Sequence, residues 1–170
     1  EKKRVHFKEF KKFIFPLPPL KEQQKIAKIL TTWDSAISKQ EELIKEKEKL
    51  KKGLMQKLLS AEVRFKEFSD EWEEVRLEEI TEIKTGKLNA NAMVENGKYT
   101  FFTCAKEIYK IDTFSFDTEA LLISGNGANV GYIHYYKGKF NAYQRTYVLD
   151  KFTQNIIFIK YMLDKFLKIK

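Results

Sequence analysis

The stretch "PLPPLKEQQKIAKIL", residues 16–30, decides how the chain folds, because a proline-rich segment gives way there to a helix-forming one. A proline ring fixes φ and removes a backbone donor, so no helix can run through Pro16 and Pro18. Pro19 suits the first turn of a helix, where its missing N–H would have no partner. Residues 20–60 contain no further proline and are rich in Lys, Glu, Leu, Ile and Gln. They predict one helix of about 40 residues, roughly 60 Å long.

Apolar residues of this predicted helix recur at heptad-type spacing along one narrow stripe. In chain order they are Ile26, Leu30, Trp33, Ile37, Ile44, Leu50, Leu54 and Leu58. A long helix whose apolar surface is a narrow stripe is normally buried against another helix. The partner is either the chain's own downstream domain or another molecule. We expect another molecule, since the downstream sequence shows no comparable second long helix.

The rest of the chain has the texture of a small sheet. Strand-length runs rich in aromatic and β-branched residues alternate there with Gly, Asn and Asp turns. The runs are "YTFFTCA" at 99–105, "ALLIS" at 120–124, "VGYIHYY" at 130–136 and "AYQRTYVLD" at 142–150. Helical spacing returns in "NIIFIKYMLDKFLKIK", residues 155–170, with Thr153 or Asn155 as a cap. Its predicted apolar face is Ile157, Tyr161, Phe166 and Ile169. The fold class is therefore α+β, or mixed α/β.

The net charge of +8 is unevenly distributed. Residues 1–60 hold 16 Lys/Arg against 8 Asp/Glu, residues 61–82 hold 3 against 9, and residues 83–170 hold 13 against 7. Two basic regions predict a polyanionic partner such as nucleic acid, although a solvated lysine-rich surface is the alternative. No apolar run approaches the roughly 20 residues of a membrane span. The single cysteine, Cys104, fits a reducing cytoplasm.

The glycine-rich run "SGNGANVG", residues 124–131, does not fit a phosphate-binding loop. Such a loop needs a Lys and a Ser/Thr directly after its last glycine, whereas Tyr132 and Ile133 follow here. The glycines also miss the G-x-G-x-x-G spacing of a dinucleotide fold. Metal binding is equally unsupported, since His6 and His134 are far apart in the sequence and no Cys/His cluster exists. We expect no catalytic residue and no metal site.

What remains suits the recognition of DNA bases and phosphates. Asn and Gln pair with adenine, Arg pairs with guanine, and Lys, Thr and Tyr contact phosphates. The candidate DNA-binding residues are Lys84, Thr85, Lys87, Asn89, Lys106, Ser124, Asn126, Asn129, Tyr143, Gln144 and Arg145. For the asparagines, an ordinary turn with left-handed residues stays an open alternative.

Five segments follow one another along the chain. They are "PLPPLKEQQKIAKIL", "KKGLMQKLLS" at 51–60, "VRFKEFSDEWEEVRLEEI" at 63–80, "KTG" at 84–86 and "LLISGNGANVGYIHYYKGKFNAYQRTYVL" at 121–149. Together, in this order, they resemble the specificity subunit of bacterial type I restriction-modification systems. The resemblance implies a cytoplasmic, non-catalytic protein in which each target-recognition domain reads half of a bipartite double-stranded DNA site. It also implies long spacer helices that dock modification subunits. S-adenosylmethionine, ATP and magnesium would then be bound by the modification and restriction subunits only.

The resemblance also divides the chain into three parts. Residues 1–19 would end a preceding recognition domain, starting in its last strand, residues 20–60 would form the spacer helix, and residues 61–170 would form a second recognition domain that stops before its end. This is the organisation of a half-subunit or fragment, and we expect two copies to pair in an antiparallel coiled coil. The alternatives are a methyltransferase with an attached recognition domain, and a coiled-coil scaffold or degenerate remnant that no longer binds DNA.

Overall fold

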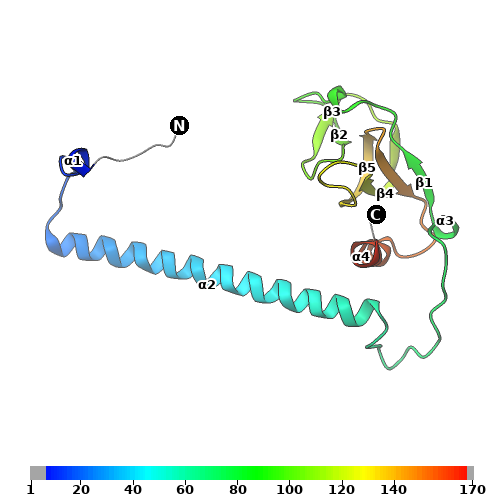
Figure 1. Cartoon of the computed structure of the whole chain (residues 1–170), viewed down its shortest axis with the longest axis horizontal. Coiled ribbons are helices and arrows are strands. Elements are labelled where there is room, and N and C mark those ends of the chain that lie inside the picture. The colour runs from blue at the N-terminus through cyan, green and yellow to red at the C-terminus, as the bar shows by residue number, and fades with distance from the viewer. Residues whose placement is uncertain (1–6, 168–170) are drawn as a thin grey trace. The chain divides into compact units, whose positions relative to one another are not determined.

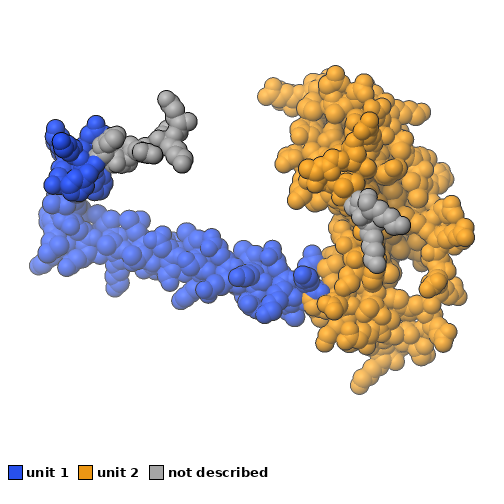
Figure 2. All heavy atoms as spheres, viewed as in Figure 1, with its two compact units in different colours: residues 1–52 blue, residues 53–170 orange. Residues whose placement is uncertain are grey.

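The computed structural model describes residues 7–167, which fold into an α+β structure with one long helix and one sheet (Figure 1). The predicted fold class is therefore confirmed. The chain divides into two compact units, Glu1–Lys52 and Gly53–Lys170 (Figure 2). Among the described residues, none of the helices has both the length and the apolar character that crossing a bilayer demands.

The first unit begins with the single helical turn α1, Phe7–Phe10, in which Lys11 donates its backbone N–H to the Phe7 carbonyl at 3.2 Å. The expected last strand is therefore wrong for these residues. Their sequence, "FKEF", lacks the alternation of apolar and polar residues that one face of a sheet requires. The remainder of the expected strand, residues 1–6, lies outside the described residues.

Helix α2, Leu20–Leu59, confirms the predicted long helix. The Pro19 carbonyl accepts the backbone N–H groups of Glu22 and Gln23 at 2.9 and 3.0 Å. Pro19 therefore caps the helix instead of lying in its first turn, because a capping residue contributes its carbonyl and needs no N–H of its own. The helix stops before Ala61, whose φ of 57° is left-handed.

The second unit contains a six-stranded sheet in the order β1-β6-β4-β5-β2-β3. Its strands are β1 Glu82–Thr85, β2 Tyr99–Phe102, β3 Tyr109–Ile111, β4 Phe116–Ser124, β5 Ile133–Ala142 and β6 Thr146–Asp150. All neighbours are antiparallel except β2 and β5. Two short helices, α3 Leu77–Ile80 and η1 Ala90–Ala92, flank β1. The run at 142–150, expected as one strand, is instead divided by a turn at residues 143–145.

The sheet buries both of its faces. Leu121 and Leu122 are neighbours on β4 and point to opposite sides, as successive strand residues must. One face carries the cluster Phe102, Ala120, Leu122, Phe140, Ala142 and Val148. The other face carries Leu121, Ile123, Ile133 and Leu149, against which α3, Phe152 and α4 pack. The core therefore lies around β4, the strand with buried residues on both sides.

Helix α4, Ile156–Phe166, covers the second face through Ile156, Ile159 and Leu163. The sequence predicted a different buried face, formed by Ile157, Tyr161, Phe166 and Ile169. Ile157 and Phe166 are 40% and 46% exposed, so that prediction is wrong for them, and Ile169 lies outside the described residues. Several faces of this helix are apolar, and the sheet selects one of them.

The cap of α4 is one of the two residues that the sequence offered. The side chain of Asn155 accepts the backbone N–H of Phe158 at 3.0 Å, which satisfies one of the unpaired donors of the first turn. Thr153, the other candidate, lies before the helix and donates its backbone N–H to the Ile80 carbonyl.

Candidate nucleic-acid interface

Four connections of the second unit are tied together by hydrogen bonds. They are residues 86–89 after β1, residues 103–108 after β2, residues 125–132 between β4 and β5, and residues 143–145 between β5 and β6. Arg145 is the centre of this arrangement, because its carbonyl accepts the Gly125 N–H at 2.9 Å and the Cys104 thiol at 3.3 Å. Gln144 donates its backbone N–H to the Leu88 carbonyl at 2.9 Å.

Two glycines allow this close approach of backbones. A Cβ on Gly86 would lie 2.0 Å from the Ala142 carbonyl oxygen, and one on Gly125 would lie 2.5 Å from that of Arg145. Both distances are far inside van der Waals contact. These two positions therefore accept only glycine, and they hold the connections in register.

The run "SGNGANVG" forms the turn between β4 and β5, in the place predicted for it. Gly127 and Gly131 have φ of 79° and 81°, values that favour glycine. Asn129 donates from its side chain to the Cys104 carbonyl at 3.3 Å, so this asparagine also binds the turn to the connection after β2. No hydrogen bond of the Asn126 side chain is recorded, and this residue is half-buried.

The structure brings most of the predicted DNA-binding residues together in these four connections. Those that are exposed or half-buried in the four connections are Lys87, Asn89, Lys106, Asn126, Asn129, Tyr143, Gln144 and Arg145. We call this set the recognition end. No Asp or Glu occurs in residues 84–89, 124–132 or 143–146, and the connection after β2 holds one exposed acid, Glu107. The recognition end therefore presents amides and positive charge together.

Ser124 and Thr85 differ from that set. Ser124 is only 2% exposed, and its hydroxyl has no recorded partner, so it lies beneath the recognition end instead of on it. Thr146, its cross-strand neighbour, is 1% exposed and also has an unpaired hydroxyl. Thr85 is exposed at the last position of β1.

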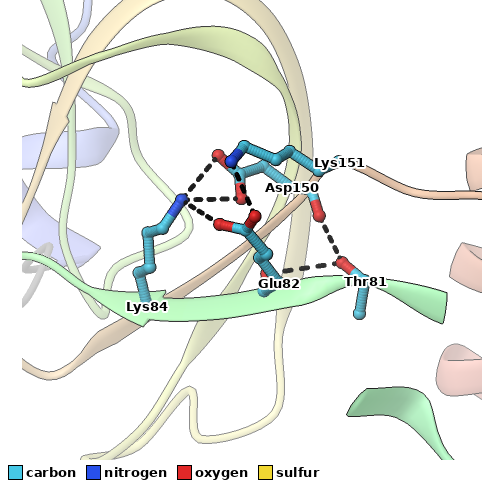
Figure 3. A network of polar contacts seen from close by, with 5 residues as sticks. All are labelled: Thr81, Glu82, Lys84, Asp150 and Lys151. Carbon is cyan, nitrogen blue, oxygen red and sulfur yellow. Dashed lines mark hydrogen bonds and ion pairs between the residues drawn. The ribbon is translucent and has the colours of Figure 1, made fainter. Parts of the chain in front are cut away.

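Lys84 takes part in an ion-pair network on β1 and β6 (Figure 3). Its ammonium lies 2.7 Å from the Glu82 carboxylate and 3.2 Å from that of Asp150. Lys151 binds the other oxygen of Glu82 at 2.6 Å, and the Thr81 hydroxyl donates to the Asp150 carbonyl. Sequence reasoning missed this network, because it joins residues 81–84 to residues 150–151, which are far away along the chain.

The network shifts the pKa values of Glu82 and Lys84. The hydrogen bond from Lys151, followed by that from Lys84, lowers the pKa of Glu82 to about 2. The pKa of Lys84 is raised, mainly because its ammonium is hydrogen-bonded to Glu82 and secondly because of Asp150. Lys84 is therefore held as a cation by protein carboxylates.

His134 has a structural role. Only 8% of it is exposed, its Nε2 lies 3.0 Å from the Ala105 carbonyl, and its ring contacts Phe102 and Tyr132. Tyr132 was missed as a candidate, although it is 39% exposed and lies under the Lys106 ammonium at 5.6 Å. Within residues 7–167, no group of three His, Cys, Asp or Glu side chains has an arrangement that could hold a metal ion.

Comparison with known protein families shows to which family the chain belongs. The family model described as type I restriction modification DNA specificity domain matches residues 1–49 and 69–170. The chain belongs to this specificity family. The matched segments include the first part of α2 and all four connections of the recognition end.

Two relatives in the type I specificity family are similar in sequence. The chain is 45% identical over 93 residues to the Escherichia coli type I restriction enzyme EcoDI specificity subunit, a match to 55% of this chain and 20% of that subunit. It is 39% identical over 103 residues to the MjaVIII specificity subunit of Methanocaldococcus jannaschii, with 55% and 24% covered. The matches thus span about a quarter or less of these relatives.

Solved specificity-family structures share the fold. The S subunit from M. genitalium superposes with a TM-score of 0.64 at 22% identity, covering 85% of this chain and 42% of that one. The HsdS subunit from Thermoanaerobacter tengcongensis gives a TM-score of 0.51 at 21% identity, covering 87% and 41%. The fold of this chain therefore corresponds to less than half of each of those subunits.

Proposed function

We propose that this chain recognises DNA as part of a type I restriction-modification complex, without catalysis of its own. Residues 61–170 would act as a target-recognition domain that reads one half of a bipartite site. The observation that carries this proposal is the convergence of four connections that hold amides, Lys and Arg and only one acid, Glu107. Amides and Arg are the side chains that discriminate bases in the major groove, and Lys binds phosphates.

The expected DNA contacts are the exposed members of the recognition end. Arg145 and Gln144 occupy the three-residue turn before β6, and their backbones are fixed by hydrogen bonds to Leu88 and Gly125. A side chain on a fixed backbone can be aimed at a base with little loss of conformational entropy. Lys106, which lies over the Tyr132 ring, is the expected phosphate contact. Ser124 and Lys84 are the least suited, because one is buried and the other is ion-paired.

The test is selection of bound sequences from random double-stranded DNA by the full chain together with its modification subunit. We expect enrichment of one defined half-site sequence, and of two such sequences at a fixed separation if the chain acts as a pair. A chain that only scaffolds other subunits would pull down DNA without any sequence preference. That result would replace the recognition function with the coiled-coil alternative.

We further propose that α2 spaces and pairs recognition domains. Its predicted apolar stripe is open: Ile26 is 44% exposed and Trp33 is 66% exposed, with the other members through Leu54 between these values. Ile29 and Leu43, at 59% and 51%, widen the stripe beyond the predicted seam. Apolar area of this extent is normally covered by a second helix. We propose that a second copy covers it in an antiparallel coiled coil, and that the paired helices dock modification subunits.

Light scattering after gel filtration at micromolar concentration tests the pairing. We expect a particle of twice the chain mass of 20.2 kDa. A monomer at that mass would overturn it. The remaining assignments follow the family: cytoplasmic location, a restriction subunit as a further partner, and S-adenosylmethionine, ATP and magnesium bound by partner subunits only.

A further inference from the structure

A second apolar surface lies in the second unit, Gly53–Lys170, which we call the recognition unit, and its lining shares no residue with the recognition end. Helix α4 and the segment before β1 enclose a groove of about 1150 Å³, which we call the apolar groove. Its main apolar lining is Trp72, Val75, Leu77, Phe158, Met162 and Phe166. Ser60 and Ala61, the residues directly after α2, line it as well.

The walls of the groove contact each other, but its apolar lining remains exposed. The Trp72 ring meets the Phe158 ring edge-on with centroids 6.2 Å apart, which fixes the two walls against each other. Trp72 nevertheless stays 47% exposed, Val75 54% and Phe166 46%. Contiguous apolar surface of this kind on a folded unit marks an interaction site. Its aromatic lining suits an extended, proline-rich segment, which loses little conformational entropy on binding.

Such a segment exists in this chain. Residues 13–19, "FIFPLPP", form no helix or strand, and their prolines restrict them to extended conformations. Their apolar side chains are among the most exposed of the described residues: Phe13 is 72% exposed, Ile14 92% and Leu17 70%. The segment therefore presents an uncovered apolar strip of the shape that the groove accepts.

The charges around the two surfaces are complementary. The segment follows three basic residues, Lys8, Lys11 and Lys12. Trp72 is flanked by the acids of "DEWEE", residues 70–74, and Glu73 and Glu74 line the groove itself. Opposite charges around an apolar contact favour one partner and orientation over others.

Along the chain, the whole of α2 lies between the segment and the groove of the same copy. Helix α2 holds its two ends about 60 Å apart, because each of its residues adds about 1.5 Å. The three Cα-to-Cα steps from Leu17 to Leu20 span only about 10 Å. Ser60, the residue that follows the last residue of α2, already lines the groove. In an antiparallel pair, by contrast, the first residues of one α2 lie beside the last residues of the other.

We propose that segment 13–17 of one copy docks in the apolar groove of a second copy. The inference rests on the antiparallel pairing proposed above. Each recognition unit would then be held by two connections, its own α2 and the segment of its partner. The angle between recognition unit and helix pair would thereby be restrained, which is what a split DNA site of fixed spacing requires.

Crosslinking between two differently tagged copies tests the docking. Both carry Cys104→Ser, one carries Ile14→Cys and the other Phe166→Cys, two exposed positions at which substitution should not disturb folding. We expect a short bis-maleimide to join the two tags at micromolar concentration. The matched control replaces Phe166→Cys by Ile108→Cys, which is 54% exposed and outside the groove, and should give little product.

A second variant reads the same contact without cysteines. Phe13→Ser combined with Phe15→Ser, both in the exposed segment, should raise the dimer dissociation constant roughly tenfold or more. The docking would be overturned if the dimer formed normally, gave no crosslink above the control and kept its dissociation constant in the double variant. Helix pairing would still stand in that case. A monomer in light scattering would overturn both. A crosslink within one chain carrying both cysteines, at a dilution where dimers dissociate, would assign the groove to the chain's own segment and also overturn the proposal.

Discussion

Gly86 shows how a single residue supports the recognition end. The space for its side chain is occupied by the Ala142 carbonyl oxygen, 2.0 Å from an ideal Cβ, and by that of Tyr143 at 2.4 Å. These atoms are backbone and cannot rotate away. Either β1 or the end of β5 must move if any larger residue is introduced.

Gly86→Ala should therefore destabilise the chain by about 1–3 kcal/mol, the usual cost of overpacking. Urea unfolding followed by circular dichroism measures this as a lower midpoint. Gly53→Ala is the control, because nothing lies within 4 Å of its Cβ position and a helix interior prefers Ala by about 1 kcal/mol. Equal stability of the Gly86→Ala and wild-type chains would contradict the close packing of the two connections.

Arg145 supplies the second prediction at this scale. Its backbone carbonyl carries the structural contacts to Gly125 and Cys104, so Arg145→Ala removes the guanidinium and leaves the frame in place. If the guanidinium reads a base, preference at one position should fall by roughly 1–3 kcal/mol while other positions are unchanged. Competition binding against single-position site variants measures it.

Lys106→Ala is the matched comparison for Arg145→Ala. A lost phosphate contact should weaken all sequences alike and reduce the slope of log affinity against log salt by about 1. If Arg145→Ala produced that uniform pattern instead, Arg145 would be a phosphate contact and base reading would lie elsewhere in the recognition end.

The ion-pair network gives a pH prediction. The pKa of Glu82 is lowered from 4.5 to about 2, so the folded chain holds fewer protons than the unfolded chain between these values. The contribution of this carboxylate to stability is complete above pH 4.5 and is lost as the pH falls through about 2. Carbon-detected NMR of the Glu82 carboxyl should show the low midpoint.

Lys151→Ala should move the Glu82 midpoint upward, because Lys151 is the largest cause of the shift. Lys137→Ala is the control, since Lys137 pairs with Glu119 and should leave Glu82 unchanged. A Glu82 midpoint unaffected by Lys151→Ala would mean that the contact to Lys151 does not persist in solution.

At the scale of elements, α2 carries the proposed pairing through its stripe. Leu30→Lys places a charge among 44–66% exposed apolar side chains that would be buried in a pair. The dimer should dissociate, as light scattering would show, whereas Thr32→Lys introduces the same residue on another face and should leave the dimer intact. Dissociation by both variants would point to general charge repulsion instead of a defined seam.

Helix α4 illustrates a different relation between sequence and structure. Its residues Ile156, Ile159 and Leu163 face the sheet, while Phe158 and Phe166 are left for the apolar groove. A helix that is apolar on two sides serves two partners. The apolar face that we predicted from the sequence is not the face that packs on the sheet. The spacing of apolar residues within a helix cannot tell which of two apolar sides meets the sheet.

At the scale of the whole molecule, the proposed pairing lies in α2 and the proposed DNA reading lies in residues 61–170. Leu30→Lys should therefore still bind a single half-site, but it should lose the added affinity of a site with two halves, since that gain comes from linking two binding events. Binding of the variant to one-half and two-half DNA, compared with wild type, measures this. An unchanged preference for two halves would show that the pair forms through other contacts.

The sequence by itself determined the features that depend on neighbours along the chain. The prolines at 16–19 and the composition after them specify where α2 begins, Asn155 caps α4, and the glycines of 124–131 specify a turn. It also identified the specificity family, whose model matches residues 1–49 and 69–170. These are local preferences of backbone and side chain, and a few residues suffice to express them.

Only the tertiary structure decided which of these residues meet. Gly86 and Ala142, Cys104 and Arg145, and Lys84 and Asp150 are each brought together by strand order, which no spacing in the sequence encodes. The same order buried Ser124, and it paired Lys84 with carboxylates. Contacts of this kind depend on the energy of the whole sheet, because the position of each strand is set by its neighbouring strands and by the packing of both sheet faces.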